Sequence, residues 1–430
     1  MQRIILDFLE HFCFNRLRRI ADRRSRADKL HPAGDTRGLA TVHSPIGYNR
    51  IGTLKMLHKC IRIRPEVVKK CLRFGSIRSL SRQSSKAFVF DIDGVLLRGN
   101  KPIPQAHQAL SLLNQEKIPF ILLTNGGGVS EEARVEFISE KLNIDISPLQ
   151  IVQSHTPMRA WAQTGEYSRV LVVGGAQDKA RHAAINYGYK DVVIPMDIVR
   201  QTPSIAPHHQ YTEHDLKKYA QDVDLSKKFD VVLVFNDPRD MGTDIQIVSD
   251  LLNSENGVIG TLREPPQTAK TRPAIPIVFS NNDYLWANDY NLPRFGQGAF
   301  RMMVERLYAE TNVLSHSETL QLTILGKPFK IQYDYAHWVL IEWNKILHGH
   351  KAHGFMPPLN KEPEGLPFTD IYMVGDNPAS DIHGANANGW ESILLRTGVY
   401  KDADWERTKH RPSVGVFDNV LDSIVKVLNK

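Results

Sequence analysis

The stretch "AFVFDIDGVL", residues 87–96, decides the fold class of this chain. An apolar run leads directly into Asp91 and Asp93, and Gly94 follows them. A continuous apolar run that stops at a polar turn is typical of a strand buried in a parallel sheet. Two carboxylates about 5 Å apart repel each other by about 3 kcal/mol at an effective dielectric constant of about 20. Their placement at one strand end therefore predicts a cation or ligand that offsets the repulsion.

From residue 87 onward, strand-like and helix-like segments alternate. Strand-like runs cover 87–90, 118–123, 169–173, 191–194, 229–235, 274–279, 320–325, 369–374 and 391–395. Helix-like segments cover 104–115, 130–142, 176–187, 243–253, 297–310, 331–347 and 380–388. We expect Ser130 to cap the second of these helices and the stretches 200–226, 261–273 and 350–367 to be surface loops. The alternation predicts an α/β fold with parallel sheets covered on both faces.

Three other strand-like runs also end on polar residues. These are Thr124 and Asn125 in "LLTNGGG", Lys327 in "ILGKP", and Asp376 and Asp381 in "YMVGDNPASD". Each pattern alone is common in turns, but ligands of open α/β sheets bind beyond the carboxyl ends of the strands. We therefore expect these side chains to meet the Asp91–Asp93 pair. The glycine patterns lack the G-x-G-x-x-G spacing, which argues against a dinucleotide site.

This ordered set resembles the haloacid dehalogenase superfamily of phosphohydrolases. The family pattern is D-x-D after the first strand, Ser or Thr after the second, a Lys, and then G-D-x-x-x-x-D. All four parts match this sequence, and the resemblance covers residues 87–430. It implies a Rossmann-like parallel-sheet core and a phosphoric monoester hydrolase.

The resemblance also implies a role for each matching residue. Asp91 would be the nucleophile that forms an aspartyl-phosphate, which divides one difficult step into two. Asp93 would protonate the leaving oxygen and later take a proton from the attacking water. Thr124 and Asn125, with nearby backbone N–H groups, would hold the phosphoryl oxygens. Lys327 would place a compact positive charge against Asp91 and the phosphate.

Mg²⁺ is the cofactor that the resemblance implies. Its ligands would be an Asp91 carboxylate oxygen, the Asp93 backbone carbonyl and Asp376. Asp381 would either bind the ion directly or hold these ligands in place without touching the ion. The chemistry agrees, because Mg²⁺ prefers oxygen ligands and offsets the cost of gathering several carboxylates.

The spacing of the motifs places a second domain in the middle of the chain. Thr124 follows Asp91 by 33 residues, which one helix and one strand fill, but Lys327 follows Thr124 by 203 residues. We expect a first part of the core at 87–150, an inserted α/β cap at 151–317 and a second part of the core at 318–430. This arrangement resembles the C2 cap of subclass IIA.

Three cap stretches resemble one branch of that subclass, the mitochondrial haloacid dehalogenase-like hydrolases of the cat-eye-syndrome critical region type. They are "SHTPM" (154–158), "VFNDPRDMGTDIQIVSDLL" (234–252) and "FSNNDYLWANDYNLPRFGQGAFRMMVE" (279–305). Fungal relatives in which such a domain is joined to a CDP-alcohol phosphotransferase hint at glycerophospholipid metabolism. A roofed site favours a small phosphorylated metabolite. Asn281, Asn282 and Asp283 either face that substrate or form a turn.

The N-terminal arm, residues 1–86, is strongly basic. It holds 20 Lys and Arg against 6 Asp and Glu, so it carries +14 while the whole chain carries +7. Residues 56–86 resemble a mitochondrial presequence in being rich in Arg and poor in acids, which predicts import, and a location in the matrix. Met56 would then be a working start. A solvated basic tail is the alternative; a nucleic-acid arm is disfavoured because the arm lacks interleaved aromatic residues.

The main hypothesis is thus a mitochondrial Mg²⁺-dependent phosphatase. A phosphotransferase using the same intermediate, or a binding or regulatory protein that keeps the fold with little turnover, are the alternatives. We expect no nucleic-acid partner and no membrane span, since no run of 18 apolar residues occurs. The expected partners are the import machinery and, through the cap, a second copy of the chain. All cysteines (Cys13, Cys60 and Cys71) lie in the arm, so the body has no thiolate chemistry.

Overall fold

The computed structural model describes residues 85–264, 269–286, 290, 292, 294–351, 354, 356–363 and 367–429. The predictions made for the basic arm, which are the presequence, the start at Met56 and the three cysteines, lie outside the described residues.

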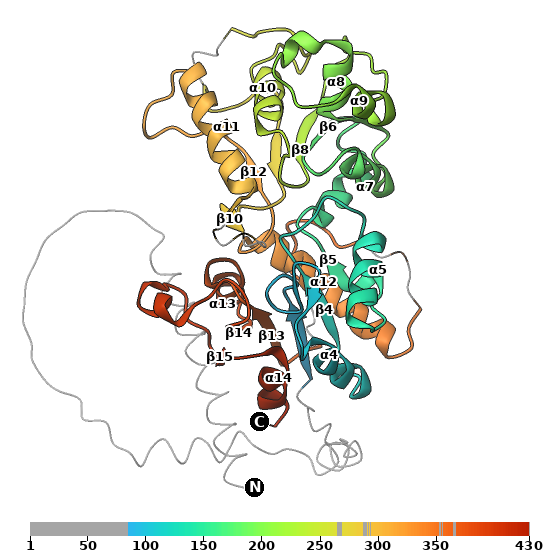
Figure 1. The fold of residues 1–430 in the computed structure, drawn as a ribbon, viewed down its shortest axis with the longest axis vertical. Helices are drawn as coiled ribbons and strands as arrows, with labels where there is room; N and C mark the ends of the chain where they lie inside the picture. Colours follow the sequence, from blue (N-terminus) through green and yellow to red (C-terminus); the bar gives the residue numbers. More distant parts are fainter. Residues whose placement is uncertain are drawn as a thin grey trace, which may run out of the picture. The chain divides into compact units, whose positions relative to one another are not determined.

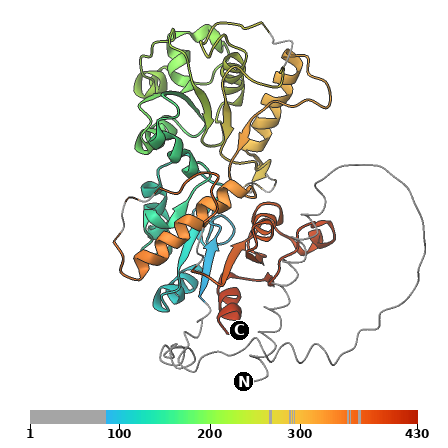
Figure 2. The same cartoon turned by 180° about the vertical axis from the view of Figure 1, so that it is seen from behind.

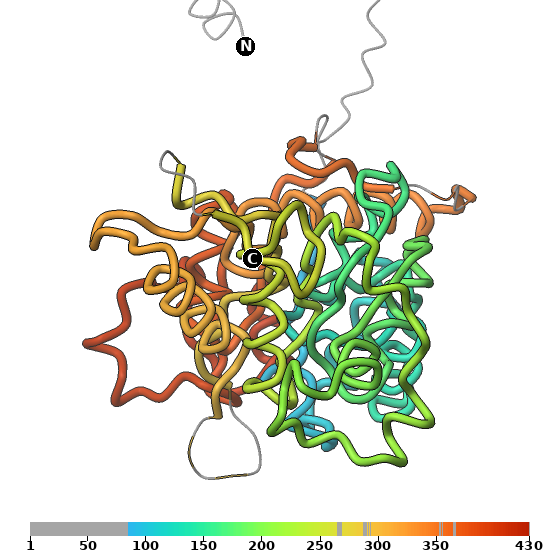
Figure 3. Tube along the Cα trace, turned by 90° about the horizontal axis from the view of Figure 1, so that it is seen from above, coloured from blue at the N-terminus to red at the C-terminus, as the bar shows by residue number. Residues whose placement is uncertain are grey.

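The first sheet combines the two ends of the described chain (Figures 1 and 3). Its strands are β1 (Lys86–Phe90), β4 (Phe120–Leu123), β5 (Ile151–Val152), β13 (Asp370–Gly375), β14 (Glu391–Leu395) and β15 (Gly415–Phe417). Their order is β15-β14-β13-β1-β4-β5, and every pairing is parallel. Strand β1 lies between β13 and β4, so Asp91, just after β1, has the polar ends of both neighbours beside it.

Helices cover both faces of this sheet. Successive side chains of β1 point to opposite faces, so both faces must be covered to bury them. Phe88 and Phe90 pack with one set of helices: α4 (Ala106–Gln115), α5 (Glu131–Leu142) and α14 (Val420–Leu428). Ala87 and Val89 pack on the opposite face with α12 (Lys330–Leu347) and α13 (His383–Ala387). Figure 2 shows α12 lying across that face. All four side chains are buried, which explains the uninterrupted apolar run of the sequence.

The second sheet forms the inserted cap. Its strands are β6 (Arg169–Val173), β7 (Asp191–Val193), β8 (Val231–Val234), β9 (Ile277–Phe279) and β12 (Thr323–Ile324). They are parallel in the order β12-β9-β8-β6-β7. One face packs on α8 (Pro195–Gln201), α10 (Met241–Leu252) and α11 (Gln297–Thr311), and the other on α7 (Lys179–Tyr187). The predicted α/β architecture, a parallel-sheet core with an inserted α/β cap, is therefore confirmed.

Smaller elements complete the described chain. They are the hairpins β2 (Leu97–Arg98) with β3 (Lys101–Pro102) and β10 (Leu285–Trp286) with β11 (Arg294–Phe295), the helices α6 (Arg159–Thr164) and α9 (Glu213–Tyr219), the 3₁₀ turns Pro148–Gln150, Thr156–Met158, Pro203–Ile205 and Asp402–Arg407, and the π-helical turn η4 (Pro378–Ile382). No helix among the described residues is both long and apolar enough to cross a membrane.

Several details differ from the sequence predictions. The expected loop 200–226 contains α9, which Thr212 caps by accepting a hydrogen bond from the Asp215 N–H. The expected cap start at 151 falls on β5, which pairs with β4 in the first sheet. The expected return to the core at 318 precedes β12, which pairs with β9 in the cap. Strand β5 has only two residues, too few to show a pattern. Strand β12 lies inside the predicted strand-like run 320–325, but such a run does not reveal which of two parallel sheets it joins.

The loops that follow the cap strands contact the loops that follow the core strands. Asn236, beyond β8, donates to the Gly127 carbonyl oxygen at 2.9 Å, and the Ser154 and Ser280 hydroxyls lie 3.1 Å apart. The carboxyl ends of the two sheets therefore meet around the glycine-rich loop 124–128.

Candidate active site

Lys327 joins two carboxylates at the centre of this junction. Its Nζ lies 2.7 Å from Asp91 Oδ1 and 2.7 Å from Asp381 Oδ1. The lysine side chain is only 2% exposed, and Asp91 and Asp381 are also buried. An ion pair this buried is costly unless the partners are held in good geometry. The sequence prediction that Lys327 faces Asp91 agrees with this position, although Lys327 follows a strand of the cap sheet.

Asp376 and Asp381 are held by backbone groups at the end of β13. Asp381 Oδ2 accepts from the N–H groups of Asp376 at 3.1 Å and Asn377 at 3.0 Å, which closes η4 onto the strand. Asp376 Oδ2 accepts from the Val399 N–H. Gly94 has a φ of +91°, and a Cβ there would lie 2.5 Å from Asp376 Oδ2. The turn after Asp93 therefore needs glycine to let Asp376 approach.

The pKa values of this cluster reflect buried charge. Burial raises the pKa of Asp91 well above its usual range, and attraction to Lys327 only partly offsets that rise. Burial, followed by repulsion from Asp381, raises the pKa of Asp376 to about 7. For Lys327, burial lowers the pKa, but attraction to Asp381 and Asp91 together outweighs it, so the pKa is raised. The lysine is therefore charged. The raised pKa values of Asp91 and Asp376 mean that a further positive charge nearby would stabilise their ionised forms.

The residues present fit a divalent cation. Carboxylate oxygens of Asp91, Asp376 and Asp381 lie within 4.8 Å of one another. Hydrogen bonds and ion pairs within the described residues use Asp91 Oδ1 and Asp376 Oδ2, which leaves the second oxygen of each for a ligand. When all three acids are ionised, three carboxylates facing one ammonium leave two negative charges, the number that a divalent cation balances. All-oxygen donors favour a hard ion such as Mg²⁺.

Asp93 is exposed, and Thr124 lies near it in the buried part of the site. The Asp93 side chain is 56% exposed and Asp93 Oδ2 lies 3.3 Å from Arg134 Nη2. Thr124 is buried, and its Oγ1 accepts from the Gly126 N–H at 2.9 Å. A Cβ on Gly126 would lie 3.3 Å from Thr124 Oγ1 and 3.7 Å from Asp93 Oδ2, so the two side chains border the same space.

Asn125 and the three cap residues form a linked set, but their contacts are largely with each other. The Asn125 amide bonds the backbone of Lys327 and the carboxylate of Asp283. Asn281 is buried and donates to the Asn125 carbonyl oxygen at 3.1 Å, whereas Asn282 accepts from Arg301 Nε at 2.9 Å. Asn281 and Asp283 thus contact the loop that carries the phosphate-binding candidates, while Asn282 is turned to α11.

Sequence reasoning missed two neighbours of the site. Arg134 contacts Asp93, and Tyr333 on α12 donates from its hydroxyl to the Asp381 carbonyl oxygen at 3.0 Å. Arg134 lies one helical turn after Ser130, the N-cap of α5. Its position near the end of β4 could therefore have been predicted from the sequence. Tyr333 lies in the expected helix 331–347, and nothing in its spacing reveals a hydroxyl contact.

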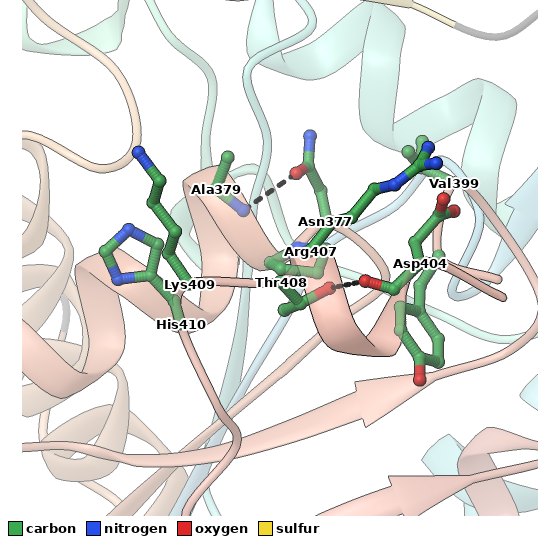
Figure 4. Close-up of a pocket in the computed structure, with 10 residues that line it drawn as sticks. Asn377, Ala379, Val399, Asp404, Arg407, Thr408, Lys409 and His410 are labelled. Atoms are coloured by element: carbon green, nitrogen blue, oxygen red, sulfur yellow. Dashed lines mark hydrogen bonds between the residues drawn. The ribbon is translucent and has the colours of Figure 1, made fainter. Parts of the chain in front are cut away.

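A separate pocket of about 350 Å³ lies beside the loop that carries Asp376 (Figure 4). It is lined by Asn377, Pro378, Ala379, Val399, Tyr400, Asp404, Arg407, Thr408, Lys409 and His410. Asn377 Oδ1 accepts from the Ala379 N–H at 3.0 Å, and the Thr408 hydroxyl donates to the Asp404 carbonyl oxygen at 2.8 Å. The pocket therefore shares the 376–379 loop with the acidic cluster but contains none of its carboxylates.

Comparison with known proteins identifies the family to which the chain is similar. Two segments match haloacid dehalogenase-like hydrolase families, residues 88–190 and residues 324–423. The mitochondrial hydrolase YKR070W of Saccharomyces cerevisiae is 52% identical over 349 residues, which cover 80% of this chain and 96% of that protein. A cardiolipin synthase (CMP-forming)/mitochondrial hydrolase fusion protein of Schizosaccharomyces pombe is 39% identical over 348 residues, and the match spans 53% of that longer protein.

Solved structures show the same fold at low sequence identity. Hypothetical protein PH1952 of Pyrococcus horikoshii has a TM-score of 0.50 and 20% identity, and the match covers 79% of this chain and 99% of that one. A haloacid dehalogenase superfamily protein of Cytophaga hutchinsonii, described as a possible sugar phosphatase, has a TM-score of 0.50 and 15% identity over 80% and 96% of the two chains. Since the yeast relative is more than half identical across almost its whole length, this chain is an enzyme of the haloacid dehalogenase-like hydrolase family.

Proposed function

We propose that this protein is a Mg²⁺-dependent phosphatase that hydrolyses a small phosphomonoester through an aspartyl-phosphate. The observation that carries the proposal is Lys327 Nζ, 2.7 Å from both Asp91 and Asp381, with Asp376 in the same carboxylate cluster. In such a cluster the fixed positive charge of Lys327 favours the ionised form of Asp91 and so opposes the effect of burial. An anionic nucleophile can attack an anionic ester only where charge is balanced in this way.

In the first half-reaction, an Asp91 oxygen attacks phosphorus and the bond to the leaving oxygen breaks. Asp93 gives its proton to that oxygen, which leaves as an alcohol. The Thr124 hydroxyl and the backbone N–H groups of the 124–128 loop hold the phosphoryl oxygens, and the Lys327 ammonium attracts them. Asp91, Asp376 and the Asp93 carbonyl would hold Mg²⁺, with Asp381 beside them. Bound there, the ion neutralises charge on the phosphoryl group.

In the second half-reaction, Asp93 takes a proton from water while the water oxygen attacks phosphorus. The bond between phosphorus and the Asp91 oxygen breaks, which releases phosphate and restores the Asp91 carboxylate. The Asp93 side chain is 56% exposed, so water reaches it readily. This exposure favours hydrolysis over transfer of the phosphoryl group to a second metabolite.

The roof over the site supports a small phosphorylated metabolite as the substrate. The cap contacts the 124–128 loop directly through Asn236, Asn281 and Asp283, which leaves less room for a folded phosphoprotein than for a metabolite. The fission-yeast relative is fused to a cardiolipin synthase. That fusion supports a phosphorylated intermediate of glycerophospholipid metabolism as the first class to test.

We also propose that the protein works in mitochondria, in the matrix, and enters through the import machinery. The Saccharomyces cerevisiae relative is named a mitochondrial hydrolase, and the Schizosaccharomyces pombe relative is named a fusion that contains a mitochondrial hydrolase. Residues 56–86 are basic with a single acid. A reporter fused behind residues 56–86 should reach mitochondria, and a diffuse cytosolic signal would contradict the proposal.

A homodimer through the cap remains a proposal. The apolar side chains of Met302, Met303 and Leu307 on α11 are exposed, which supports a contact at that helix. Sedimentation velocity of the full chain tests the dimer. A single monomeric species at micromolar concentration would contradict it.

The central experiment measures hydrolysis of p-nitrophenyl phosphate with and without Mg²⁺, using the full chain and Asp91→Asn. The wild-type protein should be active only with Mg²⁺, and Asp91→Asn should be inactive because an amide cannot act as the nucleophile. Asn282→Ala, which removes a side-chain hydrogen bond with Arg301, serves as the matched control. Undiminished activity of Asp91→Asn would remove the nucleophile assignment.

A further inference from the structure

The amide of Asn125 is fully engaged inside the protein. Its Oδ1 accepts from the Lys327 N–H at 2.7 Å, and its Nδ2 donates to the Lys327 carbonyl oxygen at 3.0 Å and to Asp283 Oδ2 at 3.0 Å. A backbone N–H can only donate and a backbone carbonyl can only accept, so the orientation of the amide is fixed. Both amide hydrogens are used, which leaves none for a phosphoryl oxygen. The side chain of Asn125 thus acts on Lys327 rather than on the phosphate.

The main chain of Lys327 is tightly confined at this point. Gly326 has a φ of +78°, and a Cβ there would lie 2.7 Å from the Ser280 carbonyl oxygen and 2.9 Å from Asn125 Oδ1. From this confined main chain the lysine reaches Asp91 and Asp381. The Asn125 amide therefore fixes the origin of the side chain whose ammonium faces the nucleophile.

Asp283 connects this amide to the cap. Its N–H donates to Asn281 Oδ1 at 3.0 Å, and its carbonyl oxygen accepts from the Gly298 N–H at 2.9 Å, in the first turn of α11. Burial raises the pKa of Asp283 to about 6, against the lowering by the Asn125 hydrogen bond and by Lys327. A carboxylate acceptor makes a stronger hydrogen bond than a neutral one.

We propose that Asp283 is a positioning residue that acts on Lys327 through Asn125, so that the cap controls where the ammonium lies opposite Asp91. The chain of contacts runs from α11 to Asp283, to the Asn125 amide, to the Lys327 backbone and then to the nucleophile. The inference rests on the proposed phosphatase function for its kinetic test. It differs from the prediction that Asp283 faces the substrate, because a substrate contact would depend on the leaving group.

The kinetic test uses the full chain, Mg²⁺ and two substrates with different leaving groups, p-nitrophenyl phosphate and glycerol 3-phosphate. Asp283→Ala should lower kcat about tenfold for both, with KM changed less than about twofold, because transition-state charge balance is lost and substrate binding is not. Asp283→Asn keeps an acceptor oxygen and should recover most of the rate. Asn282→Ala, on the same loop but bonded to Arg301, should match wild type. A loss confined to one substrate, a loss in KM alone, or no loss would overturn the proposal.

A second readout needs no catalysis. Reductive methylation of Lys327 in the full chain, followed by mass spectrometry, reports how well the ammonium is held between Asp91 and Asp381. Labelling should be slow in wild type and in Asn282→Ala and several-fold faster in Asp283→Ala. Equal labelling in all three would overturn the inference. If wild type hydrolyses no phosphate ester, the proposed function fails, yet this labelling still decides whether Asp283 positions Lys327.

Discussion

At the residue scale, the acidic cluster couples proton binding to stability. The ordinary pKa of Asp376 is 3.8, and burial and repulsion from Asp381 raise it to about 7 in the metal-free protein. A raised carboxyl pKa means that the folded state binds the proton more tightly than the unfolded state does. The metal-free fold is therefore best stabilised by this group below pH 4, and that contribution is lost as the pH rises towards 7.

Mg²⁺ should therefore stabilise the protein more at pH 8 than at pH 5. At pH 5 the cation must displace a proton from Asp376, whereas at pH 8 the carboxylate is ready to bind. The check is the rise in Tm on adding Mg²⁺ after chelator treatment, at both pH values. Asp376→Asn is the control and should show a small rise at either pH; an equal Mg²⁺ effect at both pH values in wild type would contradict the assignment.

Replacing Asp93 should affect catalysis without affecting the fold. Asp93→Asn should reduce kcat about 100-fold, within the range expected for losing a general acid and base. Its Tm should stay near that of wild type, because the side chain is exposed and surface ion pairs contribute little. Arg134→Ala removes the same ion pair and keeps the acid, so it should remain active. Unchanged turnover in Asp93→Asn would mean that another group moves the proton.

At the scale of the elements, the long and strongly patterned segments were predictable. The apolar runs of β1, β6 and β13 and the cap at Ser130 appear as expected, because their patterns are dictated by burial and by backbone N–H groups. The pairing of β12 with the cap was not predictable, since the strand-like run 320–325 does not reveal which of two parallel sheets it joins. Helix α14 was not predicted, although Val420, Ile424 and Val427 follow a helical spacing; its several β-branched residues weaken a helical signal in so short a segment.

The cap of α5 provides a test at this scale. Ser130 Oγ accepts from the Ala133 N–H at 3.3 Å, and Glu131 and Glu132 begin the helix. Ser130→Ala should lower the free energy of unfolding by about 1 kcal/mol, the usual value for a lost N-cap. Urea denaturation measures this change, and Ser130→Asp should restore the stability. A variant as stable as wild type would show that tertiary packing alone holds this end of α5.

At the scale of the whole molecule, the separate motifs could be predicted to meet, but the contacts between core and cap could not. Each of the four catalytic motifs can be recognised in the sequence from its residue types and from its position after a strand. The contact of Asn125 with Asp283 joins residues 158 positions apart, and neither residue stands in a pattern that identifies its partner. Such a contact depends on how two sheets are placed, which no local pattern specifies.

The roof formed by the cap also predicts selectivity by size. Asp91 is buried, and cap residues bond directly to the 124–128 loop. A phosphoserine peptide should therefore have a kcat/KM more than about tenfold below that of a small phosphomonoester, because a long chain must displace these contacts. Malachite-green assays on matched substrates measure the ratio. Equal efficiency would show that the cap does not restrict access.

The ion pair between Asp91 and Lys327 spans 236 positions of the chain, and Asp381 lies further on still. During translation, the nucleophile leaves the ribosome long before either partner is made. Until then its carboxylate can only stay hydrated at the growing surface. A nascent or prematurely terminated chain that ends before Asp376 thus lacks the machinery for turnover, however completely its first strands have paired.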